Sequence, residues 1–112
     1  YIIRYIPDKS YEYNYKKFSD IIDEVLKKII YNGKGIEINT AGLRYGLNAT
    51  NPSAEIVLRY RELGGEIITI GSDAHYSRDI GSGFDIAYDM LKSCNFKYYN
   101  IFRKRKPEFI QL

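Results

Sequence analysis

Three short apolar segments begin near residues 36, 67 and 98, and this even spacing constrains the fold more than any other feature of the sequence. They read GIEINT at 35–40, EIITIGSD at 66–73 and YYNIF at 98–102, and each has the length and composition of a strand. About thirty residues separate their starts, which is the size of a strand-helix-strand unit. The spacing therefore predicts an α/β chain whose strands pair in parallel through right-handed crossovers.

Helical patterns fill the intervals between these segments. Residues 15–31 place apolar side chains at the spacing of an amphipathic helix, with Gly33 just past its end as a left-handed cap. Asn51 is predicted to cap a second helix, with Pro52 at its first position and Gly64 at its end. Each predicted strand is thus followed or preceded by a helix.

The composition fits one small domain of a globular protein. The 112 residues are 45% hydrophobic and 28% charged, and no apolar run reaches the ~20 residues of a membrane span. The single cysteine, Cys94, lies late in a third predicted helix at 84–94, which favours a buried thiol in a reducing compartment, the cytoplasm. The chain opens on Tyr1 within an apolar pattern, and we interpret it as a piece of a longer protein.

The charge gives little support for a nucleic-acid partner. The net charge is +3, and the one basic concentration is FRKRKPEF at 102–109. Four consecutive basic residues could hold phosphates, but the pattern is also that of a solvated strand end, which is our interpretation. We expect neither a nucleic acid nor a membrane as partner.

The only histidine, His75, follows the second predicted strand, two residues after Asp73. Side chains alternate along a strand, so Ile68 and Ile70 share one face, while Asp73 and His75 share the other if the extended geometry persists. A carboxylate and an imidazole on one side of the backbone can bind one or two divalent cations, and zinc, manganese and iron suit this donor pair. A hydrogen-bonded structural histidine is the alternative.

The first predicted strand has the same two faces. Ile36 and Ile38 oppose Glu37 and Asn39, so both strands combine an aliphatic face with a polar one. This pattern suits a barrel or crevice whose polar contents lead to an active site at the carboxyl ends of the strands.

The blocks GSDAH at 71–75 and EINTAGLR at 37–44, and the ending YYNIFRKRKP, resemble the histidinol phosphatases of the PHP (polymerase and histidinol phosphatase) family. The resemblance covers about two thirds of the chain. It implies a distorted (β/α)7 barrel with a multinuclear metal centre. On this basis residues 1–112 are the carboxyl-terminal part of a single PHP domain, with about three strand-helix units, and the amino-terminal part is absent.

The resemblance also implies roles for individual residues. Asp73 and His75 become metal ligands, and Arg44 becomes a phosphate clamp, for which its planar fork is suited. Arg4 is a second candidate for phosphate binding, because the family carries an arginine a few residues after a metal-binding histidine.

Two further residues, Glu37 and Asn39, are expected to pack in the barrel interior or to stand behind the metal ligands. The reaction that the resemblance implies is hydrolysis of L-histidinol phosphate to L-histidinol and phosphate, a step of histidine biosynthesis. The attacking group would be a metal-bound hydroxide, since no serine or cysteine is paired with a base for nucleophilic catalysis.

One departure from the family leaves other interpretations open. His75 is the only histidine, and two ligands cannot hold a multinuclear centre, so we expect the isolated chain to be inactive and, with open sheet edges, to self-associate. A PHP phosphoesterase acting on nucleotides or nucleic acid is one alternative. A non-catalytic α/β interaction module is the other.

Overall fold

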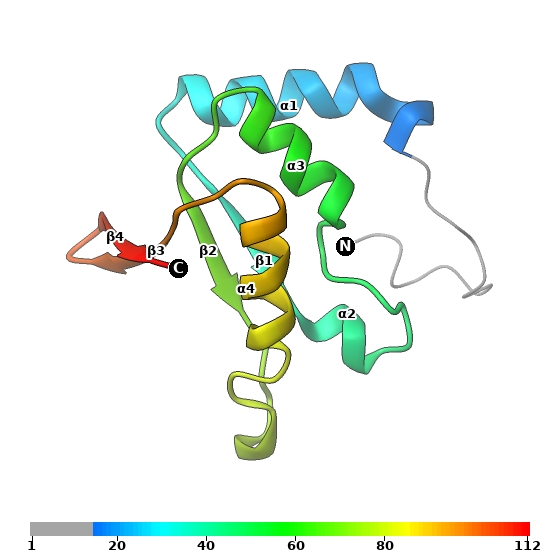
Figure 1. Ribbon diagram of the computed structural model, residues 1–112, viewed down its shortest axis with the longest axis vertical. Helices are drawn as coiled ribbons and strands as arrows, with labels where there is room; N and C mark the ends of the chain where they lie inside the picture. Colours follow the sequence, from blue (N-terminus) through cyan, green and yellow to red (C-terminus); the bar gives the residue numbers. More distant parts are fainter. Residues whose placement is uncertain (1–14) are drawn as a thin grey trace.

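A computed structural model describes residues 15–112, in which helices and strands alternate along the chain (Figure 1). In order, the elements are η2 (Tyr15–Phe18), α1 (Ser19–Tyr31), β1 (Ile36–Asn39), α2 (Ala41–Arg44), α3 (Ala54–Glu62), β2 (Ile68–Gly71), η3 (Ser77–Asp79), α4 (Phe84–Ser93), β3 (Tyr98–Arg103) and β4 (Lys106–Gln111). Across this part of the chain, each helix is too short or too polar to cross a membrane.

Strands β1 and β2 pair in parallel, as their spacing predicts. Ile36 lies opposite Ile68, and the pairing continues to Asn39 opposite Gly71. Ile68 is fully buried, whereas Glu37, on the other face, is exposed. The predicted alternation of aliphatic and polar faces is confirmed within these strands.

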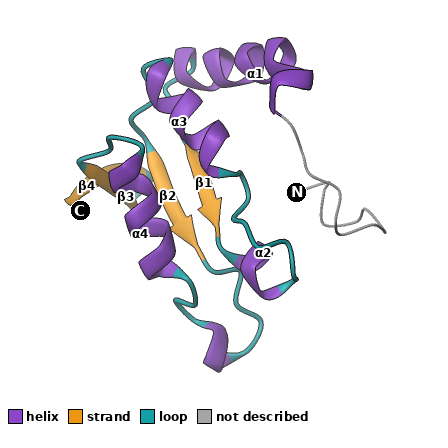
Figure 2. Cartoon of the chain, turned by 45° about the vertical axis from the view of Figure 1, so that its right-hand side comes forward, coloured by secondary structure: helices purple, strands orange, loops and turns teal. Residues whose placement is uncertain are grey.

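Helices α1, α3 and α4 supply the rest of the core, and Figure 2 shows α3 and α4 beside the two parallel strands. The buried core residues come from all these elements and from the segment that follows α4: Leu26, Ile38, Val57, Tyr60, Ile68, Ala87, Leu91, Cys94 and Phe96. Burial of this apolar surface is the main force that holds the helices on the sheet.

Two of the predicted helices form where their patterns place them. The pattern over 15–31 becomes η2 followed by α1, and Gly33 beyond it has the expected left-handed conformation, with φ of 61°. The third predicted helix, over 84–94, becomes α4, which ends one residue earlier, at Ser93. Cys94 is buried as predicted, and burial raises the pKa of its thiol.

The second helix begins later than predicted. Helix α3 starts at Ala54, with Ser53 as its N-cap, so the assignment of Asn51 as cap and Pro52 as first helical residue is wrong. The backbone of Asn51 is already engaged: its N–H donates to the Asn39 carbonyl at 2.9 Å, and its carbonyl accepts from the Asn39 N–H at 2.8 Å. This bridge holds the segment extended beside the end of β1.

The third predicted strand does not join the parallel sheet. Residues Tyr98–Arg103 form β3, but β3 pairs antiparallel with β4 in a hairpin, so the prediction of a three-stranded parallel sheet is wrong for the described residues. Lys104 and Arg105 form the turn with φ of 49° and 66°. Two successive positive φ values are those of a type I′ turn, whose twist matches that of paired strands.

A side-chain hydrogen bond joins the hairpin to the parallel sheet. Asn100 is 2% exposed, and its Oδ1 accepts a hydrogen bond from the backbone N–H of Ile68 at 2.8 Å. An amide oxygen here replaces the carbonyl that a neighbouring strand would offer to β2. The hairpin is therefore held beside β2 without backbone pairing.

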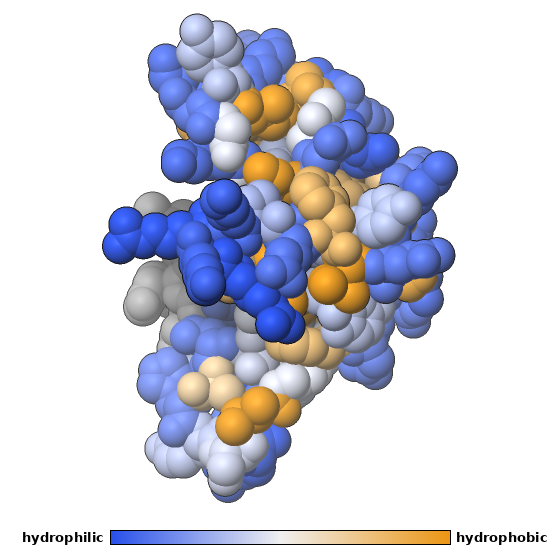
Figure 3. Space-filling view, turned by 90° about the vertical axis from the view of Figure 1, so that its left-hand side faces the viewer, coloured by the Kyte–Doolittle hydropathy of each residue, from blue (hydrophilic) through white to orange (hydrophobic). Residues whose placement is uncertain are grey.

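The hairpin exposes aromatic side chains on one face. Tyr98, Phe102 and Phe109 are 45%, 54% and 50% exposed, and strand register places them on the same side. Figure 3 views the molecule from the side on which the hairpin lies, and shows hydrophobic side chains gathered beside strongly hydrophilic ones. This surface combines apolar area with the basic turn.

An ion pair joins α1 to α3. Arg59 donates through Nη2 to Oδ2 of Asp23 at 2.6 Å and through Nε to Oδ1 at 3.0 Å, and the Tyr15 hydroxyl donates to the same carboxylate at 2.6 Å. Hydrogen bonds from Arg59 and then from Tyr15 lower the pKa of Asp23 from 3.8 to about 2. The carboxylate is thus favoured in its charged form.

Replacing Asn100 with alanine should lower the free energy of unfolding by about 1–3 kcal/mol, because the Ile68 N–H would be left buried without its acceptor. Gln111→Ala, at an exposed position of β4, is the control and should change stability by less than about 0.5 kcal/mol. Urea denaturation of both variants measures the difference. Equal stabilities would show that Asn100 does not hold the hairpin.

The Asp23 pair should make stability depend on acid pH. A lowered folded-state pKa means that the contribution is present above about 4 and is lost as pH falls from 3.8 towards about 2. Denaturation midpoints measured between pH 5 and 2 should therefore fall more steeply for the wild type than for Asp23→Asn. Parallel curves would contradict the assignment.

Candidate functional site

The carboxyl ends of β1 and β2 lie side by side, and the predicted site residues follow both strands. The pairing ends at Asn39 opposite Gly71, and the Thr40 N–H extends it by donating to the Gly71 carbonyl at 2.9 Å. Beyond β1 the chain turns into α2, which carries Arg44 at its end. Beyond β2 it enters a long connection to α4, residues 72–83, which we call the β2–α4 loop.

The β2–α4 loop leaves the extended conformation at Asp73, whose φ is 50°. Side chains alternate between the two faces of β2 only as far as Gly71, two residues before Asp73. Strand alternation therefore does not place Asp73 and His75 on the same face. The Nδ1 atom of His75 lies 3.0 Å from the Asp73 backbone carbonyl, and the imidazole is exposed. A carbonyl only accepts, so this hydrogen bond requires a proton on Nδ1, and in the neutral imidazole the lone pair is then on Nε2.

Arg44 reaches across to the start of this loop. Its Nη2 donates to the Ser72 carbonyl at 2.7 Å and to the Asp73 carbonyl at 3.2 Å. Its Nε lies 3.9 Å from Oδ2 of Asp79, and the two side chains are 20% and 21% exposed. The Nη1 atom is buried and has no hydrogen-bond partner among the residues described.

A second set of contacts holds the end of the loop, and pattern analysis did not identify it. The Thr40 hydroxyl donates to the Ser82 carbonyl at 2.5 Å, and Thr40 is fully buried. The Gly81 N–H donates to Ser72 Oγ at 3.2 Å, which closes the loop on itself. Thr40 stands within the EINTAGLR block, directly after Asn39, so its place in that block was the available signal.

Glu37 and Asn39 lie on the polar side of β1. The Glu37 carboxylate lies over Gly71, since a Cβ at that glycine would come within 2.9 Å of both carboxylate oxygens. Asn39 Oδ1 accepts from the Ala41 N–H at 2.9 Å and so stabilises the first turn of α2. Their expected places in a barrel interior or behind metal ligands stay predictions.

The metal assignment can be compared with the donors that this structure contains. Within residues 15–112, no group of three or more His, Cys, Asp or Glu side chains is placed to hold a metal ion. Asp73 and His75 offer oxygen and nitrogen donors that suit zinc or manganese, but two donors leave coordination incomplete. The other phosphate-binding candidate, Arg4, lies outside the described residues.

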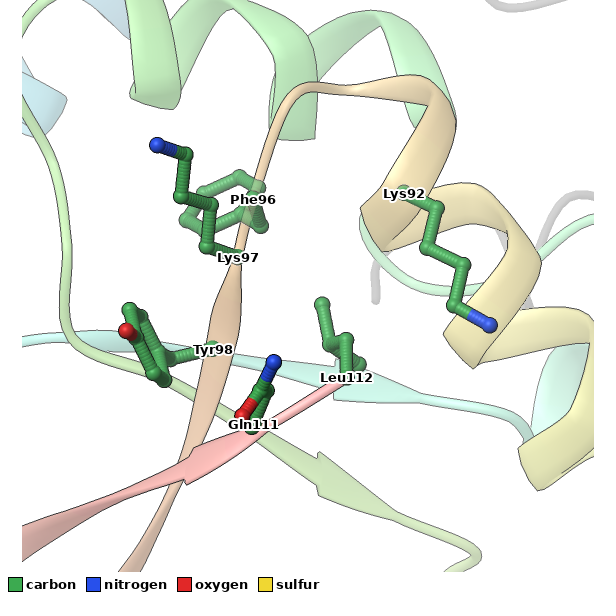
Figure 4. A pocket seen from close by; sticks show the side chains of 6 residues that line it. All are labelled: Lys92, Phe96, Lys97, Tyr98, Gln111 and Leu112. Atoms are coloured by element: carbon green, nitrogen blue, oxygen red, sulfur yellow. The ribbon is translucent and has the colours of Figure 1, made fainter.

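The molecule also has a hollow away from this site. Its volume is about 320 Å³, and it is lined by residues from the end of α4, the start of β3 and the end of β4: Lys92, Phe96, Lys97, Tyr98, Gln111 and Leu112. Figure 4 shows the two lysine side chains extending in different directions, not converging on one point. None of the predicted site residues lines this hollow.

Comparison with known proteins gives relatives that are named as phosphatases. The chain is 41% identical over 92 residues to a probable histidinol-phosphatase of Thermotoga maritima, covering 82% of this chain and 39% of the relative. It is 45% identical over 97 residues to a probable histidinol-phosphatase of Clostridium acetobutylicum, covering 87% and 38% respectively. A histidinol-phosphatase of Lactococcus lactis is 25% identical over 96 residues, or 86% of this chain and 35% of that protein. No protein-family profile matches the chain.

The conformation of Asp73 can be tested by substitution. Asn tolerates the left-handed region, so Asp73→Asn should change stability by less than about 0.5 kcal/mol, whereas Asp73→Val should lower it by about 1–2 kcal/mol. Ala74→Val places the same side chain at the exposed neighbouring position and is the control. Thermal denaturation that gives equal losses for the two valine variants would contradict the turn.

Proposed function

Because the chain is a homologue of the histidinol-phosphatases and spans about two fifths of their length, we propose that its complete protein is a phosphatase that hydrolyses L-histidinol phosphate to L-histidinol and phosphate. The observation that carries this proposal is 41–45% identity over more than four fifths of the chain to two proteins of that name. The matched region includes the ends of both parallel strands, where chemistry collects in parallel α/β folds.

The fold supports a PHP barrel as the parent architecture. Strands β1 and β2 are parallel, with one aliphatic face against the helices and one polar face that carries Glu37. In a closed barrel the helices form the outer ring and the other face points inward. We therefore propose that β1 and β2 are two strands of a distorted (β/α)7 barrel, completed by strands from the remainder of the protein.

The metal centre is part of the same proposal. Asp73 and His75 would be two of its ligands, and the remaining ligands would come from the rest of the protein, since the described residues hold no complete set. Zinc, manganese or iron, when bound, lowers the pKa of a coordinated water and neutralises charge on the phosphoryl group. The Nδ1 hydrogen bond of His75 supports this role, because it leaves Nε2 as the donor atom.

Arg44 would bind the phosphate of the substrate. Its guanidinium already approaches the Asp73 turn, and its planar fork suits contact with phosphate oxygens. Arg4 would be a second phosphate ligand. Cys94 is set apart from this chemistry, because it is buried in the core and burial raises its thiol pKa.

The 112-residue chain alone should lack this activity. It carries two of the proposed ligands, and it exposes apolar side chains such as Ile21 and Val25 of α1, at 66% and 53%. Surfaces of this kind favour association, so we propose that the isolated chain is inactive and self-associates.

The test is phosphate release from L-histidinol phosphate, with manganese or zinc, by the complete protein and by the 112-residue chain. The complete protein should turn over and the chain should not, with light scattering reporting the mass of each. Asp73→Asn in the complete protein should lower turnover by about 100-fold or more, because even the partners of metal ligands contribute 10–100-fold. Asp85→Asn, an exposed carboxylate at the start of α4, is the matched control.

Other outcomes select other functions. Faster turnover of nucleotides or nucleic acid would indicate a phosphoesterase of different specificity. Failure of the complete protein to hydrolyse any phosphate ester would favour a non-catalytic interaction module, for which the incomplete ligand set of the described residues is the supporting observation.

A further inference from the structure

The β2–α4 loop, which carries Asp73 and His75, is attached to the segment after β1 at both of its ends. At its start, Arg44 donates to the carbonyls of Ser72 and Asp73. At its end, Thr40 donates to the carbonyl of Ser82. These contacts join residues 28 to 42 positions apart in the chain.

The contact made by Thr40 is short and enclosed. Thr40 is fully buried, and its single hydroxyl proton faces the Ser82 carbonyl at 2.5 Å, with the Gly71 carbonyl more distant at 3.4 Å. The loop also presses on Thr40 at Gly83, where a Cβ would come within 3.2 Å of Thr40 Cβ and 2.8 Å of Leu43 Cδ1. The loop therefore ends against Thr40 at close range.

Thr40 is not part of the hydrophobic core, which is formed by other residues of the sheet and helices. Its hydroxyl makes its short contact with the loop, at the Ser82 carbonyl, and a longer one with the Gly71 carbonyl at the end of β2. A hydroxyl that contacts a carbonyl across the ends of two strands can set where the intervening loop lies relative to the sheet.

We propose that Thr40 is a positioning residue: through the Ser82 carbonyl it fixes the β2–α4 loop in the conformation that presents Asp73 and His75 at the carboxyl edge of the sheet. The consequence for catalysis rests on the proposed function, in which these two side chains are ligands. Arg44 fixes the start of the loop in the same way, so the two anchors lie on either side of Asp73 and His75.

The test compares Thr40→Val, Thr40→Ser and Thr50→Val in the complete protein. Valine keeps the shape of threonine but replaces the hydroxyl with a methyl group, which cannot donate to the Ser82 carbonyl. Serine keeps the hydroxyl and therefore the hydrogen bond. Thr50 is the matched control, since it is 7% exposed and its hydroxyl donates to a backbone carbonyl at 2.7 Å, that of Pro52, outside the loop.

Amide hydrogen exchange over residues 72–83 is the first measurement, and it does not depend on activity. Thr40→Val should speed exchange in this loop by about 10-fold, lower manganese affinity and kcat by about 10-fold, and change KM less, because the loop is misplaced and not lost. Thr40→Ser should restore all of these values to within about twofold. Thr50→Val should leave exchange in the loop and kcat unchanged.

The outcomes separate the two proposals. If Thr40→Val and Thr50→Val speed exchange alike throughout the domain and leave kcat per folded molecule unchanged, Thr40 is merely structural and the inference is overturned. If Thr40→Val loosens the loop selectively but the wild-type protein does not hydrolyse histidinol phosphate, the positioning role stands and the proposed function is the one overturned.

Discussion

The parallel pairing of β1 with β2 is the constraint on which the rest of the structure depends. Its register, Ile36 with Ile68 through Asn39 with Gly71, sets each buried isoleucine, Ile38 and Ile68, beside a partly buried one for the helices to cover. The same register brings both carboxyl ends to one edge. A shift of one residue would turn the aliphatic side chains to the polar face and separate the two ends.

The candidate site of the described residues is built on that shared edge. Arg44 and Thr40 come from one strand's end and the β2–α4 loop from the other, and hydrogen bonds between them shape the Asp73 turn. The helices beneath are held by apolar burial and by the Asp23–Arg59 pair. The outer surfaces of α1 and of the hairpin are not covered by other elements among the described residues, and both expose apolar side chains. That exposure agrees with a chain spanning about two fifths of its curated relatives.

Periodicity predicted the elements well where a local pattern reflects a buried face. Helix α1, helix α4 and the alternation within both parallel strands follow from apolar spacing, because each presents one face to the same core. The hairpin was missed because its turn, Lys104–Arg105, lacks the Asn-Gly or Asp-Gly pair that signals type I′ geometry. The start of α3 was misplaced because Asn51 pairs with Asn39, a contact that no local pattern reveals.

By itself the sequence determined which residues are available for chemistry: one histidine, an aspartate two residues before it, and the strands that precede them. Local spacing is sufficient for this, since secondary structure follows from which side chains a segment must bury. Only the tertiary structure decided that Asp73 leaves the extended conformation, that Arg44 binds the backbone of its turn, and that Thr40 holds the far end of the loop. The contacts of Arg44 and Thr40 are hydrogen bonds between groups about thirty to forty residues apart in the chain. They exist only once strand pairing has brought the carboxyl ends of β1 and β2 together.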